Sequence, residues 1–269
     1  MVEIFENIRK LYQFRPPCEE LSEYIEFFSE SSLKETRAIM GSARFSIKMF
    51  PSWTPTIWIN LSSPYHLTMG NNHYFVPADK DILIVRDTIV ERFNLSTDYI
   101  FSIKFFPGGL EAIFGIDQSK MTNQVVDLRE ILLPSLILKV KRMDSFEKRM
   151  KLMQDFFLSQ FREKKGRDYY IGFVRDIVAR YETGEMRYNV NEISARFFTS
   201  SKTINRYFNQ IIGTSPKNYF SILRVRTALT EYVAGKKSFT FSDFGYYDMS
   251  HFYKDVVKFT GQRLMENKL

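Results

Sequence analysis

The sequence has 269 residues, 44% of them hydrophobic and 26% charged, which is typical of globular proteins and excludes a disordered chain. Its apolar runs are too short to cross a bilayer, no secretory signal is visible, and the single Cys18 excludes an internal disulfide. The net charge of +7 is uneven, because residues 161–269 contain 19 Lys and Arg against 11 Asp and Glu, whereas residues 1–160 contain 19 against 20. We therefore expect a cytoplasmic protein without membrane contact, whose C-terminal part meets a polyanion.

Residues 1–135 are predicted to form a small β-barrel or β-sandwich. Short segments alternate apolar and polar residues, as half-buried strands do, and Pro, Gly and Asn turns separate them. Two helices, over 2–12 and 19–28, are expected to flank the strands, which are predicted at 44–50, 56–61, 81–85 and 99–105. Several aromatic side chains either line a small-molecule pocket or fill the barrel, namely Trp53, Trp58, Tyr65, Phe75, Phe101 and Phe105.

Residues 136–164 are predicted to be a helical connector. An apolar stripe recurs there at helical spacing on a charged background, formed by Phe146, Met150, Met153, Phe156, Phe157 and Phe161. This stripe is a candidate surface for homodimer or interdomain contact, or else it packs in the core. The polar residues 164–168 then mark a boundary.

Residues 165–269 are predicted to be all helical. Helices are expected near 169–181, 190–197, 201–211, 216–233 and 250–260, with a short turn near 240–244. The whole chain is thus expected to have an α+β fold, with a small N-terminal β-barrel followed by an all-α domain.

The helix predicted over 201–211 has one apolar and one polar face. Ser200 suits its N-cap, and the apolar residues that recur at four- and three-residue spacing are Ile204, Phe208 and Ile211. The residues on the outer side are Ser201, Lys202, Asn205 and Arg206. Because arginine pairs with guanine and asparagine with adenine in the major groove, these side chains are candidates for DNA contacts. The alternative is that they are ordinary solvent-facing residues.

The turn after this helix carries strong helix-boundary signals. Gly213 suits a left-handed C-cap, Ser215 an N-cap and Pro216 the first position of the next helix. In that next helix, Arg224 and Arg226 are available for a DNA phosphate, an acidic partner or a structural salt bridge.

Residues 165–262 resemble the DNA-binding domain of AraC/XylS-type transcription regulators, which are bacterial. The resemblance is carried by Ser200-x-x-x-Ile204-x-Arg206-x-Phe208, by Gly213-x-Ser215-Pro216-x-x-Tyr219 with Arg224 and Ala228, and by Gly245-Tyr-Tyr-Asp-Met-Ser-His-Phe252 with Lys258-Phe-Thr-Gly261. It implies seven helices in two helix-turn-helix units joined by a long helix at 216–233. It also implies double-stranded DNA and the transcription machinery as partners. The second reading helix would offer Met249, Ser250, Tyr253 and Lys254.

The N-terminal part is similar to a sensor-like domain that a subset of these regulators carries. The similarity rests on Pro17, on residues 21–28 and on Phe105-Phe-Pro-Gly-Gly-Leu-Glu-Ala-Ile-Phe114. It implies a cupin-like barrel that regulates the reader through a small-molecule effector or through protein contact. From the residues alone, Pro107-Gly-Gly109 is first a turn.

Three departures from the family pattern concern the second unit. Residues 235–244 lack the usual Ile-Ala core pattern, Val256 stands where a phenylalanine is usual, and Arg263-Leu264 replaces a Ser/Thr-Pro pair. The second unit is therefore expected to pack less well, or to contact the DNA backbone more than the bases.

Other functions have less support in the sequence. No nucleotide-binding motif is present, and no catalytic, cofactor or metal residue is assigned. His66 and His73, with Asp79 and Asp81 nearby, lack the close ligand spacing of a metal site. Two alternatives stay open, a protein–protein interaction module with an acidic partner and a metal-dependent cupin-like enzyme.

Overall fold

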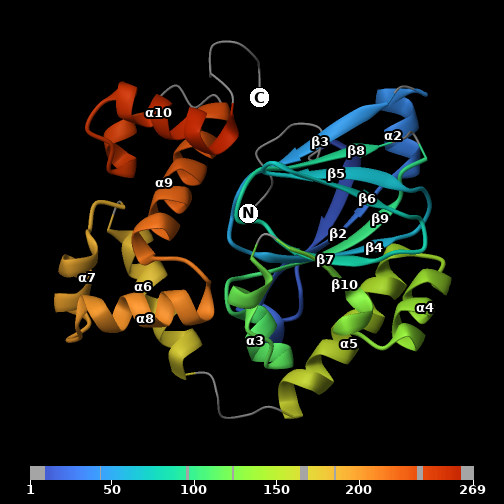
Figure 1. Ribbon diagram of the computed structural model, residues 1–269, viewed down its shortest axis with the longest axis horizontal. Coiled ribbons are helices and arrows are strands. Elements are labelled where there is room, and N and C mark those ends of the chain that lie inside the picture. Colours follow the sequence, from blue (N-terminus) through green and yellow to red (C-terminus); the bar gives the residue numbers. More distant parts are fainter. Residues whose placement is uncertain are drawn as a thin grey trace.

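A β-rich N-terminal part and a helical C-terminal part lie side by side in the computed structural model (Figure 1). The structure describes residues 10–42, 44–94, 97–122, 124–163, 169–184, 186–234 and 239–261. Strands followed by helices confirm the predicted α+β class. Within the described ranges, no helix is both long and apolar enough to cross a membrane.

Two antiparallel sheets build the N-terminal barrel. The six-stranded sheet runs β1 (Tyr12–Arg15), β2 (Ile25–Ser31), β9 (Ile100–Phe105), β4 (Pro55–Asn60), β7 (Ile82–Val85) and β10 (Val125–Asp127). The four-stranded sheet runs β3 (Phe45–Met49), β8 (Val90–Asn94), β5 (Tyr65–Met69) and β6 (Asn72–Val76). The strands predicted at 44–50, 56–61, 81–85 and 99–105 are confirmed, because β3, β4, β7 and β9 occupy them.

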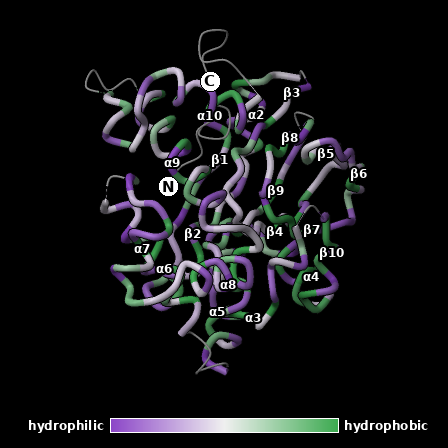
Figure 2. Tube along the Cα trace, turned by 60° about the vertical axis from the view of Figure 1, so that its left-hand side comes forward, coloured by the Kyte–Doolittle hydropathy of each residue, from purple (hydrophilic) through white to green (hydrophobic). Residues whose placement is uncertain are grey.

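The central strand β9 is buried on both faces, which the predicted half-buried pattern did not anticipate. Phe101 and Phe105 pack toward the helices that cover the six-stranded sheet. The alternating residues Ser102 and Lys104 point instead into the barrel. Apolar residues accordingly gather along β4, β7 and β9 (Figure 2).

Among the described residues, four α-helices belong to the barrel part, α2 (Leu33–Met40), α3 (Gly109–Phe114), α4 (Pro134–Arg142) and α5 (Phe146–Glu163). The Phe157 ring of α5 lies 6.5 Å from Phe28, 5.7 Å from Phe105 and 5.6 Å from Phe114. The apolar stripe of α5 is therefore core, and its interpretation as a dimer surface is wrong for the buried residues Phe146, Met153 and Phe157.

The helix predicted over 2–12 falls mostly outside the described residues, of which Lys10 and Leu11 are helical, whereas the helix predicted over 19–28 is wrong. Residues 1–9 lie outside the description, and 12–15 form strand β1. Within 19–28, only Glu19–Leu21 is helical, as a short 3-10 turn, and Ile25–Ser31 is strand β2. Strand β2 pairs with β1 on one side and with β9 on the other, and this pairing in the sheet overrides the local helical pattern.

The C-terminal part contains α6 (Tyr169–Thr183), α7 (Val190–Arg196), α8 (Ser201–Ile211), α9 (Pro216–Val233), the 3-10 turn η4 (Phe241–Phe244) and α10 (Met249–Thr260). These bounds confirm the predicted helices to within about two residues. Residues 235–238, which begin one of the family departures, and residues 262–269, which contain another, lie outside the described residues.

Candidate DNA-binding interface

Helix α8 forms as the sequence predicts. The Ser200 hydroxyl accepts a hydrogen bond from the backbone N–H of Thr203 at 3.1 Å, which satisfies one free donor of the first turn. Ile204 and Phe208 are fully buried, and Ile211 nearly so. Gly213 follows the helix with φ of 89°, a conformation that other residues rarely adopt.

Helix α7 and the turn before α8 complete the first helix-turn-helix unit. Asn189 and Glu192 form a capping box at the start of α7. The Ser201 hydroxyl, at the start of α8, donates to Asn191 Oδ1 at 2.6 Å and thereby ties the two helices together. Phe198 in the turn has φ of 49° and an exposed fraction of 98%.

The four candidate residues of α8 differ in their exposure and in the contacts that they make. Lys202 and Arg206 are exposed and lie four residues apart, so they share one helix face. The Arg206 guanidinium lies over the Tyr207 ring, 4.9 Å from its centroid. Ser201 is held by Asn191, and the Asn205 amide donates to the Ser201 carbonyl at 2.8 Å. Lys202 and Arg206 are thus the residues most available to a duplex.

The second unit is built from η4 and α10. The Asp248 carboxylate caps α10 by accepting from the N–H of His251 at 2.7 Å, and Phe252 and Val256 are fully buried. Val256 thus fills the core position where the family pattern has phenylalanine. Of the candidate residues, Ser250 and Lys254 are exposed. Met249 and Tyr253 are half-buried and pack against the apolar cluster around Phe252.

The two candidate arginines of α9 form ion pairs within the protein. Arg224 pairs with Asp255 of α10 at 3.2 Å and lies 4.5 Å from the centroid of the Tyr246 ring. The Arg226 side chain is 8% exposed and lies 3.8 Å from Glu26 of β2, in the other domain. The structural salt bridge is therefore the correct interpretation of both residues.

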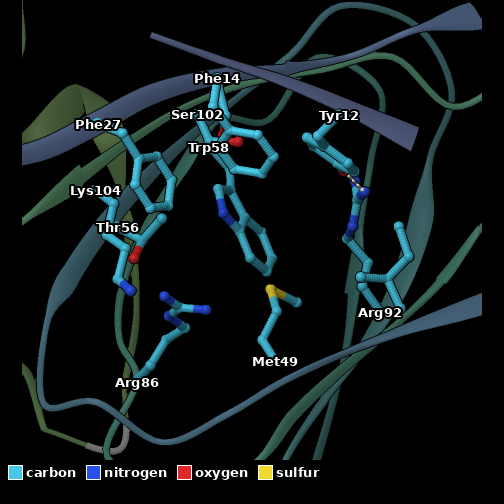
Figure 3. Close-up of a pocket in the computed structure, with 12 residues that line it drawn as sticks. Tyr12, Phe14, Phe27, Met49, Thr56, Trp58, Arg86, Arg92, Ser102 and Lys104 are labelled. Carbon is cyan, nitrogen blue, oxygen red and sulfur yellow. Dashed lines mark hydrogen bonds between the residues drawn. The ribbon is translucent and has the colours of Figure 1, made fainter. Parts of the chain in front are cut away.

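The interior of the barrel contains a small cavity, and Figure 3 shows the residues that line it. Trp58 and Met49 reach into it, and three cationic side chains line it together with Tyr12, namely Arg86, Arg92 and Lys104. Arg92 pairs with Asp98 at 2.8 Å, Lys104 pairs with Glu26 at 2.9 Å, and burial raises the pKa of Tyr12 to about 12. The remaining cavity is about 40 Å³, room for little more than a water molecule or a small ion.

The other predicted pocket aromatics lie elsewhere. Tyr65 packs edge-on against Trp58, Phe101 and Phe105 face the helices, and Phe75 is 59% exposed on β6. Side chains thus fill most of the barrel, which was one of the two interpretations of the sequence.

A larger cavity, of about 460 Å³, lies between the two domains. Its apolar wall comes largely from α6 and α9, including Ile171, Val174, Val178, Ile222 and Leu223. Glu26 and Arg226 line it as an ion pair, and Glu182, whose pKa is raised by burial, lines it as well. The barrel contributes Ser52, Thr54, Phe106 and Pro107.

Two of the candidate metal residues, Asp81 and His66, have structural partners. Asp81 accepts from the Asn60 N–H at 2.8 Å and pairs with Lys141 at 2.9 Å, and His66 packs against Phe75. Across the described part of the chain, no three His, Cys, Asp or Glu side chains form a group that could hold a metal.

Comparison with known proteins gives one family match. A family model described as a helix-turn-helix domain matches residues 193–266, and no curated protein matches the chain. Among solved structures, ToxT from Vibrio cholerae is 12% identical over 83% of this chain and 96% of that chain, with a TM-score of 0.49. ToxT bound to an unsaturated fatty acid is 14% identical over 82% and 89%, with a TM-score of 0.45. The AraC-like transcriptional activator CuxR is 12% identical over 83% and 89%, with a TM-score of 0.27.

The matched region begins in α7 and contains α8, α9, η4 and α10. It therefore contains the second helix of the first unit and the elements η4 and α10 of the second, with the capping and core residues described above. The C-terminal part of the chain is accordingly a helix-turn-helix domain of the AraC type.

Proposed function

We propose that the protein is a sequence-specific, double-stranded-DNA-binding transcription regulator of the bacterial cytoplasm. The observation that carries the proposal is that both reading helices, in a domain with a net positive charge, expose cationic side chains. Lys202 and Arg206 of α8 and Ser250 and Lys254 of α10 are all exposed. A helix of this size enters the major groove with its N-terminal end toward the bases.

Each residue has a proposed role. Arg206 reads a base, Lys202 a base or phosphate, and Ser250 and Lys254 do the same from the second unit. Asn205 takes part by exchanging its bond to the Ser201 carbonyl for a base edge. Ser201, Met249 and Tyr253 lie at the same helix faces and are proposed to contact the duplex where their packing allows.

Selection of duplexes from a random library by the full-length protein tests the proposal. We expect one sequence to be enriched, and the logarithm of its affinity to fall linearly with the logarithm of salt concentration, by about 0.9 for each phosphate contacted. Enrichment of no sequence would refute the proposal. Equal binding to every duplex would favour the alternative, a basic module whose natural partner is an acidic protein.

We also propose that a small-molecule effector binds in the interdomain cavity. Its 460 Å³ lie within the usual range for ligand sites, whereas the 40 Å³ inside the barrel do not. Native mass spectrometry of the freshly purified protein would detect such a molecule. A Val174→Trp variant, whose indole fills the cavity, should not carry it, and equal loading of both proteins would place the effector elsewhere.

A further inference from the structure

The loop between β3 and β4, residues 50–54, reaches from the barrel into the helical domain. Phe50 directly follows β3 and is 1% exposed. It belongs to the same apolar cluster as Ile222 of α9 and Phe252 of α10. Its ring lies 6.5 Å from that of Phe259, in the last turn of α10. The loop therefore supplies part of the core of the second helix-turn-helix unit.

The same loop is tied to the first unit through one buried amide. Gln118, which is fully buried, donates to the Trp53 carbonyl at 3.2 Å and to the Ile212 carbonyl at 2.9 Å. Its own oxygen accepts from the Gly108 N–H at 3.2 Å. Ile212 is the C-cap of α8, so Gln118 satisfies a carbonyl that the helix end leaves free.

Close backbone packing reinforces this contact. A Cβ on Gly108 would lie 2.9 Å from Ile211 Cγ2, and a Cβ on Gly213 would lie 3.0 Å from Ser119 Cα. Gly213 also has the positive φ noted above. Neither position accepts a larger residue without separating α8 from the barrel, which gives the glycine of the Pro107-Gly108 turn a role beyond chain reversal.

Both reading helices are thus contacted by the barrel at their C-terminal ends. For α8 the contact is at Ile211 to Gly213, and Figure 1 shows this end of α8 beside α3. For α10 it is at Phe259, one residue before the helix ends. The N-terminal ends, with Lys202 and Ser250, remain exposed.

We propose that the 50–54 loop positions the two reading helices relative to each other, so that both units engage one duplex together. The inference rests on the proposed DNA-binding function and adds a positioning role for a loop outside the helix-turn-helix domain. Two linked binding modules gain affinity only when their geometry lets both bind at once. Because the loop fixes both helices at their C-terminal ends, it controls that geometry without touching DNA.

The loop is also placed to respond to a ligand. Its backbone is fixed by Arg86, whose carbonyl accepts from the N–H groups of Ser52 and Trp53 at 2.7 and 2.9 Å, and whose N–H donates to the Thr54 carbonyl at 3.2 Å. The Arg86 side chain lines the barrel interior (Figure 3). Ser52 and Thr54 line the interdomain cavity, so a molecule bound there would contact the loop directly.

The experiment compares full-length wild type, Phe50→Ala and Phe75→Ala on the duplex selected by the wild type and on the same duplex with either half-site scrambled. Phe75 makes a matched control because it is exposed on β6. We expect Phe50→Ala to lower the ratio of two-site to one-site affinity about tenfold or more while one-site affinity is unchanged. Phe75→Ala should keep the wild-type ratio.

An unchanged or increased ratio for a folded Phe50→Ala protein overturns the inference, as does an equal loss on both kinds of duplex. Phe50→Leu, which keeps most of the apolar volume, and Gln118→Met, which cuts the link to Ile212, are measured alongside. These two variants decide the question if Phe50→Ala is unfolded at the assay temperature. Failure of the selection itself would refute the proposed function, which is a distinguishable result.

Discussion

Glu26 lies between two cations that come from different domains. Its carboxylate pairs with Lys104 of β9 at 2.9 Å and faces Arg226 of α9 at 3.8 Å, and its side chain is 3% exposed. Burial by itself raises the pKa of Glu26, but the charges of Lys104 and Arg226 outweigh it and hold the pKa below its usual value. The carboxylate is therefore charged in the folded protein and stabilises it.

Replacing this carboxylate should be costly. We expect Glu26→Gln to lower the free energy of unfolding by about 3–5 kcal/mol, because it removes the charge of the carboxylate that pairs with the fully buried Lys104. Because the folded pKa is depressed, the stabilisation is present above the unfolded value of about 4.3 and is lost as pH falls through the folded pKa. Denaturant titrations at several pH values should show the gap between wild type and variant closing only at acidic pH.

The control for this prediction is Glu20→Gln. Glu20 pairs with Arg162 at 2.8 Å, but both side chains are more than half exposed, so its loss should cost at most about 1 kcal/mol. A Glu26→Gln protein as stable as Glu20→Gln would show that the buried pair contributes little.

Arg206 is the side chain we expect to carry base recognition in the first unit. Arg206→Ala should reduce the preference for the selected duplex over a random one by about 1–3 kcal/mol, the range for a bidentate arginine–guanine contact. Competition binding at fixed salt measures this preference. If selected and random duplexes lose affinity equally, Arg206 contacts phosphate only.

Local patterns predicted some of these residues and missed others. The α8 core and the exposure of Lys202 and Arg206 follow from helical spacing and were expected. Lys104 was missed as a buried charge, because Ile-Phe-Ser-Ile-Lys-Phe has the alternation of a strand with one wet face. The spacing of residues along β9 does not reveal that the second face of this strand packs against another sheet and is not exposed to water.

At the scale of elements, α5 shows that the residues packed against an apolar helical stripe decide whether the stripe is core or interface. Phe157 is fully buried among the rings of Phe28, Phe105 and Phe114. We expect Phe157→Ala to lower the free energy of unfolding by about 3–5 kcal/mol and to leave the oligomeric state unchanged. Denaturant unfolding and light scattering measure the two quantities. A change of oligomeric state with little loss of stability would restore α5 as a dimer surface.

The misassigned N-terminal helix has an equally specific cause. Leu21, Tyr24, Ile25 and Phe28 have the i, i+3, i+4, i+7 spacing of an amphipathic helix, and all four are buried. In the structure the register of β2 against β9 shifts between Ile25 and Phe27. This bulge resets the alternation, so Ile25 and Phe28 share one face of a strand. A bulge leaves no sign in the sequence that distinguishes it from a helical turn.

At the scale of the molecule, the docking of the two domains was the least predictable feature. Several of its contacts come from Phe50, Trp53, Gly108 and Gln118, which lie in loops or short turns with no periodic pattern to reveal a buried partner. Only the charge difference between the two parts, and the motifs of the second, were visible beforehand. They predict a DNA-binding domain but not the part of the barrel against which this domain packs.

One consequence of this docking can be tested on the intact protein. A single apolar cluster runs from Phe28 and Phe157 of the barrel part to Ile171, Ile204 and Phe208 of the helical part. Because a large apolar interface couples the stability of the domains it joins, we expect one cooperative unfolding transition and not two. Differential scanning calorimetry should give a calorimetric enthalpy equal to the van't Hoff enthalpy, with far- and near-ultraviolet circular dichroism changing together.

Glu26→Gln weakens the ionic part of the same interface and should move this single transition to lower temperature. Two resolved transitions in the wild type would show that the helical domain keeps its fold without the barrel, and the 50–54 loop would then be dispensable to the core of the second unit.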